Sequence, residues 1–247
     1  MDSFSGDCCQ ILDWDSGFFG FPVGRARTDL QPQMLPGLMK ECEEKRVRCL
    51  YLLADPGNPE MLAALEYHGF GLKDVRLTLR HPDPVSGGAR GSSVRPAGPA
   101  DLDALRRIAR LSHHDSRFYF DSGFPRERCD DLYDVWISKS CCNGYADAVL
   151  VTEFEGRASS YVTCSMVGTR RGQIGLLAVA PETRGTGVGR QLIQAALAWF
   201  GQRGAEDAIT VTQGRNVAAV RAYERTGFVM ESLQFWYHRW FSSAMQE

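Results

Sequence analysis

The stretch APETRGTGVGRQLIQAALAWF, residues 180–200, places three glycines between an apolar run and a segment with helical periodicity. Gly185, Gly187 and Gly189 leave backbone N–H groups free of side-chain bulk near the start of that helix. Arg184 adds a full positive charge at the same place. Such residues at a helix N-terminus predict a site for a bound pyrophosphate, and a plain strand-to-helix turn is the alternative.

Two other phosphate loops do not fit this spacing. A Rossmann fingerprint needs G-x-G-x-x-G after the first strand of its unit, whereas this loop reads G-x-G-x-G. A P-loop ends in Lys followed by Ser or Thr, and the loop here has neither pair. The spacing therefore disfavours nucleoside-triphosphate chemistry.

The hydrophobic pattern of the second part of the chain predicts the elements that hold this loop. A helix begins at Asp101, a hairpin turns at residues 155–157, and an apolar strand over 173–180 leads into the loop. A helix over about 188–202 follows, and then a strand, a helix and a strand near 207–212, 216–225 and 232–240. This order predicts an α/β fold with a mixed sheet.

Two segments of the chain repeat one pattern. CLYLLADPGNPEMLAALEYHGF aligns without a gap with DAITVTQGRNVAAVRAYERTGF, at an offset of 158 residues. The identities in register include Asn58 with Asn216, Gly69 with Gly227 and Phe70 with Phe228. Each glycine is a natural left-handed cap for the preceding helix. The first segment is thus interpreted as a half-sized relative of the back half of the second. Leu65 stands where the second copy has Tyr223, which indicates a task shared by the tyrosine and the glycine loop.

The composition and charge of the sequence argue against several classes of protein. The 247 residues are 44% hydrophobic, with a formal charge of −2, so we expect no nucleic-acid partner. The N-terminal residues MDSFSGDCCQILDWD resemble neither a signal peptide nor a membrane span, so we expect a cytoplasmic protein without a membrane partner. Eight cysteines without a C-x-x-C pair predict reduced thiols and no metal site.

A stretch rich in proline and glycine, HPDPVSGGARGSSVRPAGPA, begins at residue 81 and separates the two repeats. We expect an N-terminal domain over residues 1–80, a linker over 81–92 and a catalytic domain over 93–247.

The glycine loop, the strand GLLAVAP before it and the later GRNVAAVRAYERTGF resemble the GNAT acetyltransferase superfamily, over about residues 93–240. The resemblance implies a mixed sheet with helices on both faces, splayed to admit the thioester arm of acetyl-CoA, and preceded here by a half-GNAT-like α/β domain. It implies acetyl-CoA as cosubstrate and no metal. The cofactor contacts would be Leu177, Ala178 and Val179 on the strand, Arg184, Gly185, Thr186, Gly187, Val188 and Gly189 in the loop, and Asn216.

Acetyl transfer to an amine needs a neutral amine, stabilisation of the oxyanion and a proton for the thiolate. We expect Tyr223 to be the general acid, since a phenol and a thiol have pKa values of about 10 and 8.5. A core tyrosine is the alternative. The N–H of Val179 can face the oxyanion. The sequence places no base, and a water chain can serve, because His113 and His114 are interpreted as exposed turn residues.

The acceptor is expected to bind after the first helix, where Arg117 can meet phosphates and Tyr119 and Phe124 can stack on a base or sugar. Simple packing is the alternative for each. The chain resembles the dTDP-4-amino-4,6-dideoxygalactose N-acetyltransferase family in four segments. They are ILDWDSGFFGFPVGR near the start, SRFYFDSGFPRERCDDLYDVWISKS after the first helix, QIGLLAVAPETRGTGVG and VTQGRNVAAVRAYERTGFVMESLQFWYHR. That resemblance implies a nucleotide-linked amino sugar as substrate, used for surface polysaccharide, and superfamily precedent allows a homodimer.

Two alternative functions are consistent with part of this site. The acceptor can instead be a peptide N-terminus, a polyamine or an antibiotic amine. A non-catalytic acetyl-CoA-binding module is the alternative from another class, and Tyr223 counts against it, since binding alone needs no proton donor at sulfur.

Overall fold

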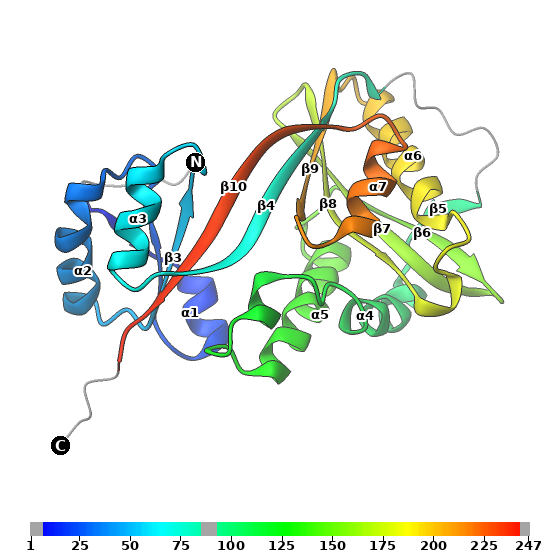
Figure 1. Ribbon diagram of the computed structural model, residues 1–247. Helices are drawn as coiled ribbons and strands as arrows, with labels where there is room; N and C mark the ends of the chain where they lie inside the picture. The colour runs from blue at the N-terminus through cyan, green and yellow to red at the C-terminus, as the bar shows by residue number, and fades with distance from the viewer. Residues whose placement is uncertain (1–6, 85–92, 243–247) are drawn as a thin grey trace. The chain divides into compact units, whose positions relative to one another are not determined.

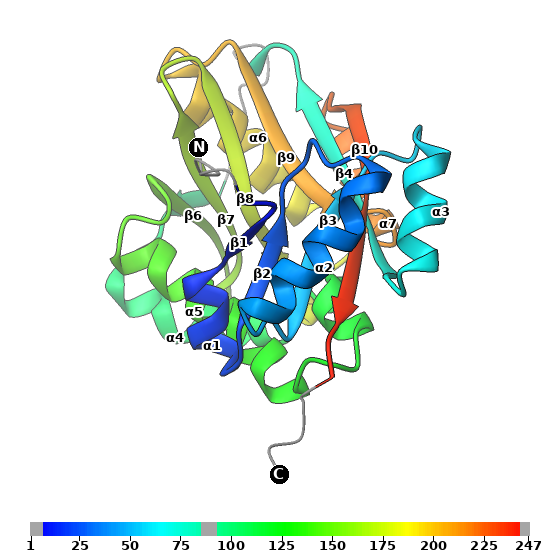
Figure 2. The ribbon, with the colours of Figure 1, turned by 90° about the vertical axis from the view of Figure 1, so that its left-hand side faces the viewer.

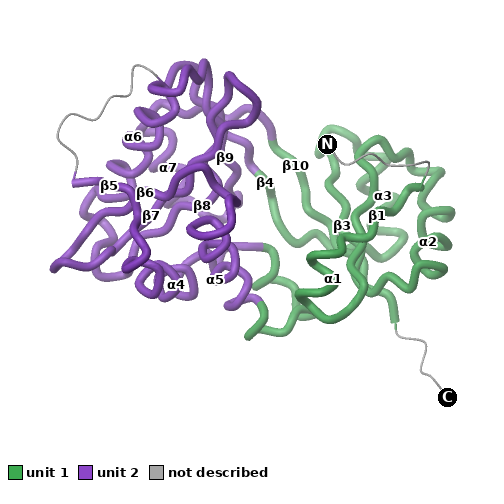
Figure 3. Tube along the Cα trace, turned by 180° about the vertical axis from the view of Figure 1, so that it is seen from behind, with its two compact units in different colours: residues 1–76, 117–128, 233–247 green, residues 77–116, 129–232 purple. Residues whose placement is uncertain are grey.

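The computed structural model describes residues 7–84 and 93–242, and the chain divides into two compact units (Figure 3). Unit 1 comprises residues 1–76, 117–128 and 233–247, and unit 2 comprises residues 77–116 and 129–232. This division differs from the linear one expected from composition, because β4 (Gly71–His81) and β10 (Val229–Trp240) each contribute to both units. Residues 85–92 of the expected linker lie outside the described residues.

Unit 2 contains a mixed sheet with the strand order β10-β4-β9-β8-β7-β6-β5 (Figure 1). Its other elements are β5 (Val94–Pro96), α4 (Leu102–Arg110), α5 (Arg126–Cys142), β6 (Ala148–Phe154), β7 (Arg157–Val167), β8 (Arg171–Val179), α6 (Val188–Gly201), β9 (Asp207–Gln213) and α7 (Val217–Glu224). Strands β6, β7 and β8 form an antiparallel meander, and β9 runs parallel to β8 after the α6 crossover. The mixed α/β class is confirmed, and the predicted elements occur in the predicted order, with α5 in addition between α4 and β6.

Helix α6 buries its apolar stripe against one face of this sheet. Leu192 and Ile193 pack with Val162 of β7 and Ile174 of β8 in one core cluster. A Cβ atom on Gly172 of β8 would lie 2.3 Å from the ring of Phe200 on α6, so the strand needs a glycine here to approach the helix. Because side chains alternate along a strand, Tyr161 on β7 points to the other face.

Unit 1 carries a smaller version of the same arrangement (Figure 2). Its elements are β1 (Cys9–Ile11), α1 (Asp13–Phe19), β2 (Val23–Ala26), α2 (Leu35–Glu44), β3 (Cys49–Ala54) and α3 (Pro59–Tyr67), with the strand order β1-β2-β3-β10-β4. Leu50 and Leu52 of β3 pack against Leu38 of α2 and Leu65 of α3. Strands β2 and β3 are parallel and joined through α2, as β8 and β9 are joined through α6.

The repeat that the sequence shows is a repeat of structure. Asn58 and Asn216 each accept a hydrogen bond from a backbone N–H three residues later, and so cap α3 and α7. Gly69 and Gly227 follow these helices with φ of 74° and 93°. The two copies also exchange their last strands, because β10 pairs with β3, and β4 lies next to β9. The half-GNAT-like first copy is therefore completed by the end of the second.

Candidate active site

The glycine loop leads directly into α6, which begins at Val188 with Gly187 as its N-cap residue at a φ of 88°. A left-handed backbone of this kind favours glycine. Gln191 donates the first helical hydrogen bond, to the carbonyl of Gly187, so the N–H groups of residues 188–190 have no intrahelical acceptor. Apart from the glycine itself and its two neighbours in the chain, no described atom lies within 4 Å of the position that a Cβ would take on Gly185 or Gly187. An anion can therefore approach the helix start closely.

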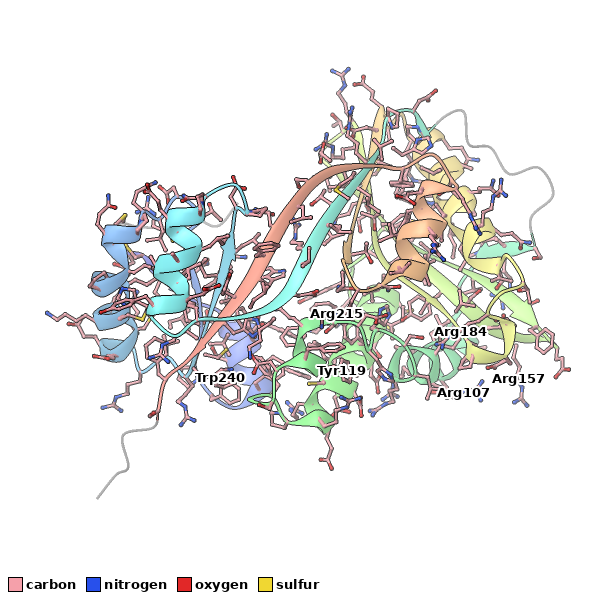
Figure 4. All side chains as sticks on the ribbon, in the orientation of Figure 1. Arg107, Tyr119, Arg157, Arg184, Arg215 and Trp240 are labelled. Carbon is pink, nitrogen blue, oxygen red and sulfur yellow. The ribbon has the colours of Figure 1, made fainter. Side chains whose placement is uncertain are left out.

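Arg184, labelled in Figure 4, connects the loop to the neighbouring elements through hydrogen bonds to neutral carbonyl groups, so its positive charge is not neutralised by these partners. Its Nε donates to the carbonyl of Val179 at 3.1 Å, and its Nη2 donates to the carbonyl of Leu111, just after α4, at 3.3 Å. Both acceptors are neutral, and the side chain is exposed. The guanidinium thus contributes a positive charge beside the loop in addition to bridging β8 and α4.

Strands β8 and β9 separate just before the loop. Their parallel pairing runs from Arg171 and Asp207 to Ile174 and Thr210, and no pairing is found beyond that point among the described residues. At the same place β8 has a bulge opposite Thr163, whose hydroxyl accepts the N–H of Leu176 at 2.7 Å. A bulge bends its strand, which accounts for the divergence.

The register of β8 decides which backbone groups face the gap. Ala180 donates its N–H to Ser159 on the β7 side, and N–H directions alternate along a strand. The N–H groups of Leu177 and Val179 therefore point away from β7, toward the side that β9 has left, whereas Ala178 faces its partner Tyr161. Of the three residues expected to contact the thioester arm, Leu177 and Val179 present open backbone N–H groups.

Helix α7 supplies Asn216 and Tyr223. The side-chain oxygen of Asn216 accepts from the N–H of Ala219 at 3.0 Å, which leaves its amide nitrogen as a donor. Tyr223 is 4% exposed and packs against Phe228 at a ring distance of 5.2 Å. Burial raises the pKa of Tyr223 to about 12, although a hydrogen bond with Thr210 opposes this shift. Its hydroxyl therefore lies at the last residue of β9 that pairs with β8.

The three expected acceptor residues lie in unit 1, whereas the loop and Tyr223 lie in unit 2. The Arg117 guanidinium is stacked 4.3 Å from the ring centres of both Phe118 and Trp236. Tyr119 lies under the Arg126 guanidinium at 4.3 Å. Phe124 is 5% exposed and packs on aromatic neighbours, which is the packing alternative considered for it.

Asp121 fixes this segment to unit 1. Its carboxylate accepts from Trp240 Nε1 at 3.0 Å and lies 2.6 Å from His238 Nδ1. Burial alone would raise the pKa of Asp121, but these hydrogen bonds lower it to about 2. No local pattern in the sequence indicates this contact, because His238 and Trp240 lie more than 100 residues further along the chain than Asp121.

His113 is not the exposed turn residue that the sequence suggests, although His114 beside it is exposed. The His113 ring is stacked on Tyr133, and its Nε2 lies 3.0 Å from the hydroxyl of Tyr161. Both partners come from distant segments, so local residue types could not have indicated the contact.

Within residues 7–84 and 93–242, no group of three or more His, Cys, Asp or Glu side chains could hold a metal ion. None of the helices in the same part of the chain is long and apolar enough to cross a membrane.

Comparison with known proteins agrees with this geometry. Residues 107–228 match the model of the acetyltransferase (GNAT) family, so the chain is an acetyltransferase of the GNAT family. The match covers the diverging strands, the glycine loop, Asn216 and Tyr223.

The chain is also similar to individual relatives and to solved structures. The chain is 28% identical to dTDP-fucosamine acetyltransferase of Escherichia coli O6:H1 over 233 residues, which are 93% of this chain and 97% of that protein. It is also 28% identical to spore coat polysaccharide biosynthesis protein SpsD of Bacillus subtilis, over 59% of this chain and 50% of that protein. A GCN5-related N-acetyltransferase from Sphaerobacter thermophilus has the same fold, with a TM-score of 0.64 at 15% identity over 94% of this chain and 76% of that one.

Proposed function

We propose that this protein transfers the acetyl group of acetyl-CoA to the 4-amino group of a dTDP-linked amino-dideoxy sugar, in the cytoplasm. The observation that carries the proposal is the likeness to dTDP-fucosamine acetyltransferase, which extends over 97% of that protein and so includes the half-GNAT-like segment. A likeness confined to the acetyltransferase domain would support the reaction but would say little about the acceptor.

Residues of unit 2 fit acetyl-CoA. The free N–H groups at the start of α6 and the charge of Arg184 suit its pyrophosphate. The open backbone N–H groups of Leu177 and Val179 suit the amide carbonyls of its pantetheine arm, in the manner of an added strand. The Asn216 amide nitrogen is a further donor.

The position of Tyr223 favours Leu177 over Val179 as the oxyanion donor. The hydroxyl of Tyr223 is next to Thr210, which pairs with Ile174 of β8. Val179 lies two residues further along β8 than Leu177, about 7 Å further from this point at the usual rise of a strand. Oxyanion and thiolate form on neighbouring atoms, so the nearer N–H is the better donor.

Tyr223 then protonates the leaving thiolate. Its raised pKa keeps the proton on the phenol throughout the neutral range. The same burial that disfavours the phenolate also disfavours an unprotonated thiolate at this position, so the two proton affinities shift in the same direction. Transfer to sulfur late in the reaction remains accessible for this reason.

Arg117 and Tyr119 are our proposed acceptor contacts. A guanidinium held between aromatic rings has little freedom left to lose, so it is suited to a phosphate of the nucleotide. Phe124 contributes by packing on Phe118 and Tyr51, two of the rings that hold the Arg117 guanidinium.

The test is thiol release from acetyl-CoA with a panel of acceptors at equal concentration. The panel contains dTDP-4-amino-4,6-dideoxygalactose, its 4-epimer, a peptide with a free N-terminus, spermidine and an aminoglycoside. We expect kcat/KM for one of the nucleotide sugars to exceed that for every other acceptor by at least about 100-fold, a discrimination of about 2.7 kcal/mol. Preferred turnover of the peptide, polyamine or antibiotic would overturn the sugar assignment. Acetyl-CoA binding without turnover of any amine would favour a binding module.

A further inference from the structure

His113 has a strained backbone in the middle of an ordered cluster. Its φ is 60°, a left-handed conformation that among the described non-glycine residues is shared only with Arg46 and Glu155. Holding a residue other than glycine there costs on the order of 1 kcal/mol, and such residues gather at functional sites. His113 follows α4 in unit 2, the unit that also contains the glycine loop and Tyr223.

Two aromatic residues fix the imidazole. Its ring lies parallel to that of Tyr133 on α5, with ring centres 4.4 Å apart and an angle of 15° between the planes. Its Nε2 lies 3.0 Å from the hydroxyl of Tyr161 on β7. The ring therefore has one orientation, set by a stack on one side and a hydrogen bond on the other.

Charged pairs hold the helix that carries Tyr133. Asp134, the next residue, is buried and accepts from Arg106 Nε at 2.6 Å and from Arg110 Nε at 2.8 Å. Both arginines lie on α4, so α5 is tied to the helix that ends just before His113. The same side chains that join the helices thus position the imidazole.

The cluster lies next to the strand that contacts the cofactor. Tyr161 is directly opposite Ala178, which stands between Leu177 and Val179 on β8. Directly opposite side chains share one face of a sheet, and Tyr161 is on the face opposite to α6. Through its contact with Tyr161, the imidazole lies over the same face of the sheet as Ala178.

The imidazole is uncharged at neutral pH. Burial, with a smaller contribution from the charge of His114, lowers the pKa of His113 to about 4. Burial also raises the pKa of Tyr161, so that residue stays a phenol and is no competing anion. An uncharged imidazole keeps one nitrogen lone pair available as a proton acceptor.

We infer that His113 accepts the proton that the amine loses as it attacks the thioester, directly or through one water molecule. This role rests on the proposed acetyl transfer to an amine, but not on which amine it is. The amine nitrogen forms a bond to the carbonyl carbon, the carbon–sulfur bond breaks, one N–H proton passes to the imidazole, and the thiolate takes its proton from Tyr223.

The low proton affinity of His113 sets the order of these events. A free ammonium group is a far weaker acid than this imidazolium, so His113 does not deprotonate the amine before it binds. Once the nitrogen has bonded to the carbonyl carbon, its N–H becomes much more acidic, and a neutral acceptor at hydrogen-bond distance suffices. The imidazolium formed in a buried place returns its proton readily to solvent.

The decisive variant is His113→Gly, because glycine accepts the left-handed backbone and leaves a space of the size of an imidazole between Tyr133 and Tyr161. We expect kcat to fall at least about 100-fold, with little change in the KM for acetyl-CoA. Added imidazole should restore at least a tenth of the lost rate, and the restored rate should rise from pH 6 to pH 8 as imidazole loses its proton.

Two further variants separate a proton acceptor from a structural residue. Glu155→Gly makes the same backbone change at a φ of 51° elsewhere in unit 2, and should keep its rate with or without imidazole. His113→Asn keeps a polar side chain that tolerates this backbone, and should be as slow as His113→Gly. Undiminished turnover by His113→Gly, or a loss that imidazole does not relieve, would overturn the role of His113. If the unaltered protein acetylates no amine at all, the proposed function fails, and this role fails with it.

Discussion

Replacing Tyr223 by Phe separates the two interpretations of this buried tyrosine. The change keeps the ring against Phe228 and removes only the hydroxyl that hydrogen-bonds to Thr210. One such hydrogen bond contributes about 1 kcal/mol, so the free energy of unfolding should fall by about that amount. If the hydroxyl also protonates the thiolate, kcat should fall at least about 100-fold, equivalent to about 2.7 kcal/mol in the barrier.

The matched control is Thr210→Val, which removes the same hydrogen bond but leaves the proton of Tyr223 in place. Thr210 also donates to the carbonyl of Ile174 at 3.3 Å, so this variant should lose about 1–2 kcal/mol of stability. Its kcat should fall less than about tenfold. Stability is read from urea unfolding, and kcat from thiol release at saturating acetyl-CoA and acceptor.

The pH dependence of kcat is a third test of the role of Tyr223. Because the pKa of Tyr223 is about 12, this residue should cause no loss of kcat between pH 8 and pH 10 in the unaltered protein. Equal and modest losses of kcat in Tyr223→Phe and Thr210→Val would refute the assignment and leave Tyr223 as a core residue.

Three other predictions concern the helix caps, the glycine loop and the buried His238. Asn216→Ala and Asn58→Ala should each lower the free energy of unfolding by about 1 kcal/mol, because each loses a helix cap, but only the former should raise the KM for acetyl-CoA. Gly187→Val should raise that KM at least about tenfold by straining the anion site, whereas Gly204→Val, at a similar φ of 79°, should cost stability alone. His238 is buried, and burial lowers its pKa to about 4, so the stability that the uncharged ring contributes is present above the unfolded pKa of about 6.5 and is lost as the pH falls toward 4. Between pH 7 and pH 4.5 the free energy of unfolding, measured with urea, should therefore fall by up to about 3 kcal/mol more in the unaltered protein than in His238→Gln.

Much of the loop and its surroundings could be predicted because the signals are local. The helix that begins at Val188, the hairpin at residues 155–157 and the caps at Gly69 and Gly227 each depend on residues a few positions apart. Backbone freedom at glycine and the side-chain period of a helix or strand are properties of the chain itself. The repeat was visible for the same reason.

The exchange of strands could not be predicted in this way. An apolar strand such as β10 has the same alternating pattern whether its neighbour belongs to its own copy or to the other one. The pairing that forms depends on the whole set of strand and helix contacts. A prediction from composition leaves these contacts out, and it therefore placed the domain boundary at the linker.

The sequence by itself determined the class of this protein: a GNAT acetyltransferase with a glycine loop before a helix and a smaller relative of its own second half. Only the tertiary structure decided how Arg184 is bonded, that Leu177 and Val179 face the gap left by β9, and that His113 is stacked on Tyr133 and hydrogen-bonded to Tyr161. The first set depends on backbone conformation over short stretches, which residue types specify. The second depends on contacts between residues far apart along the chain, whose energies exist only once the elements have packed.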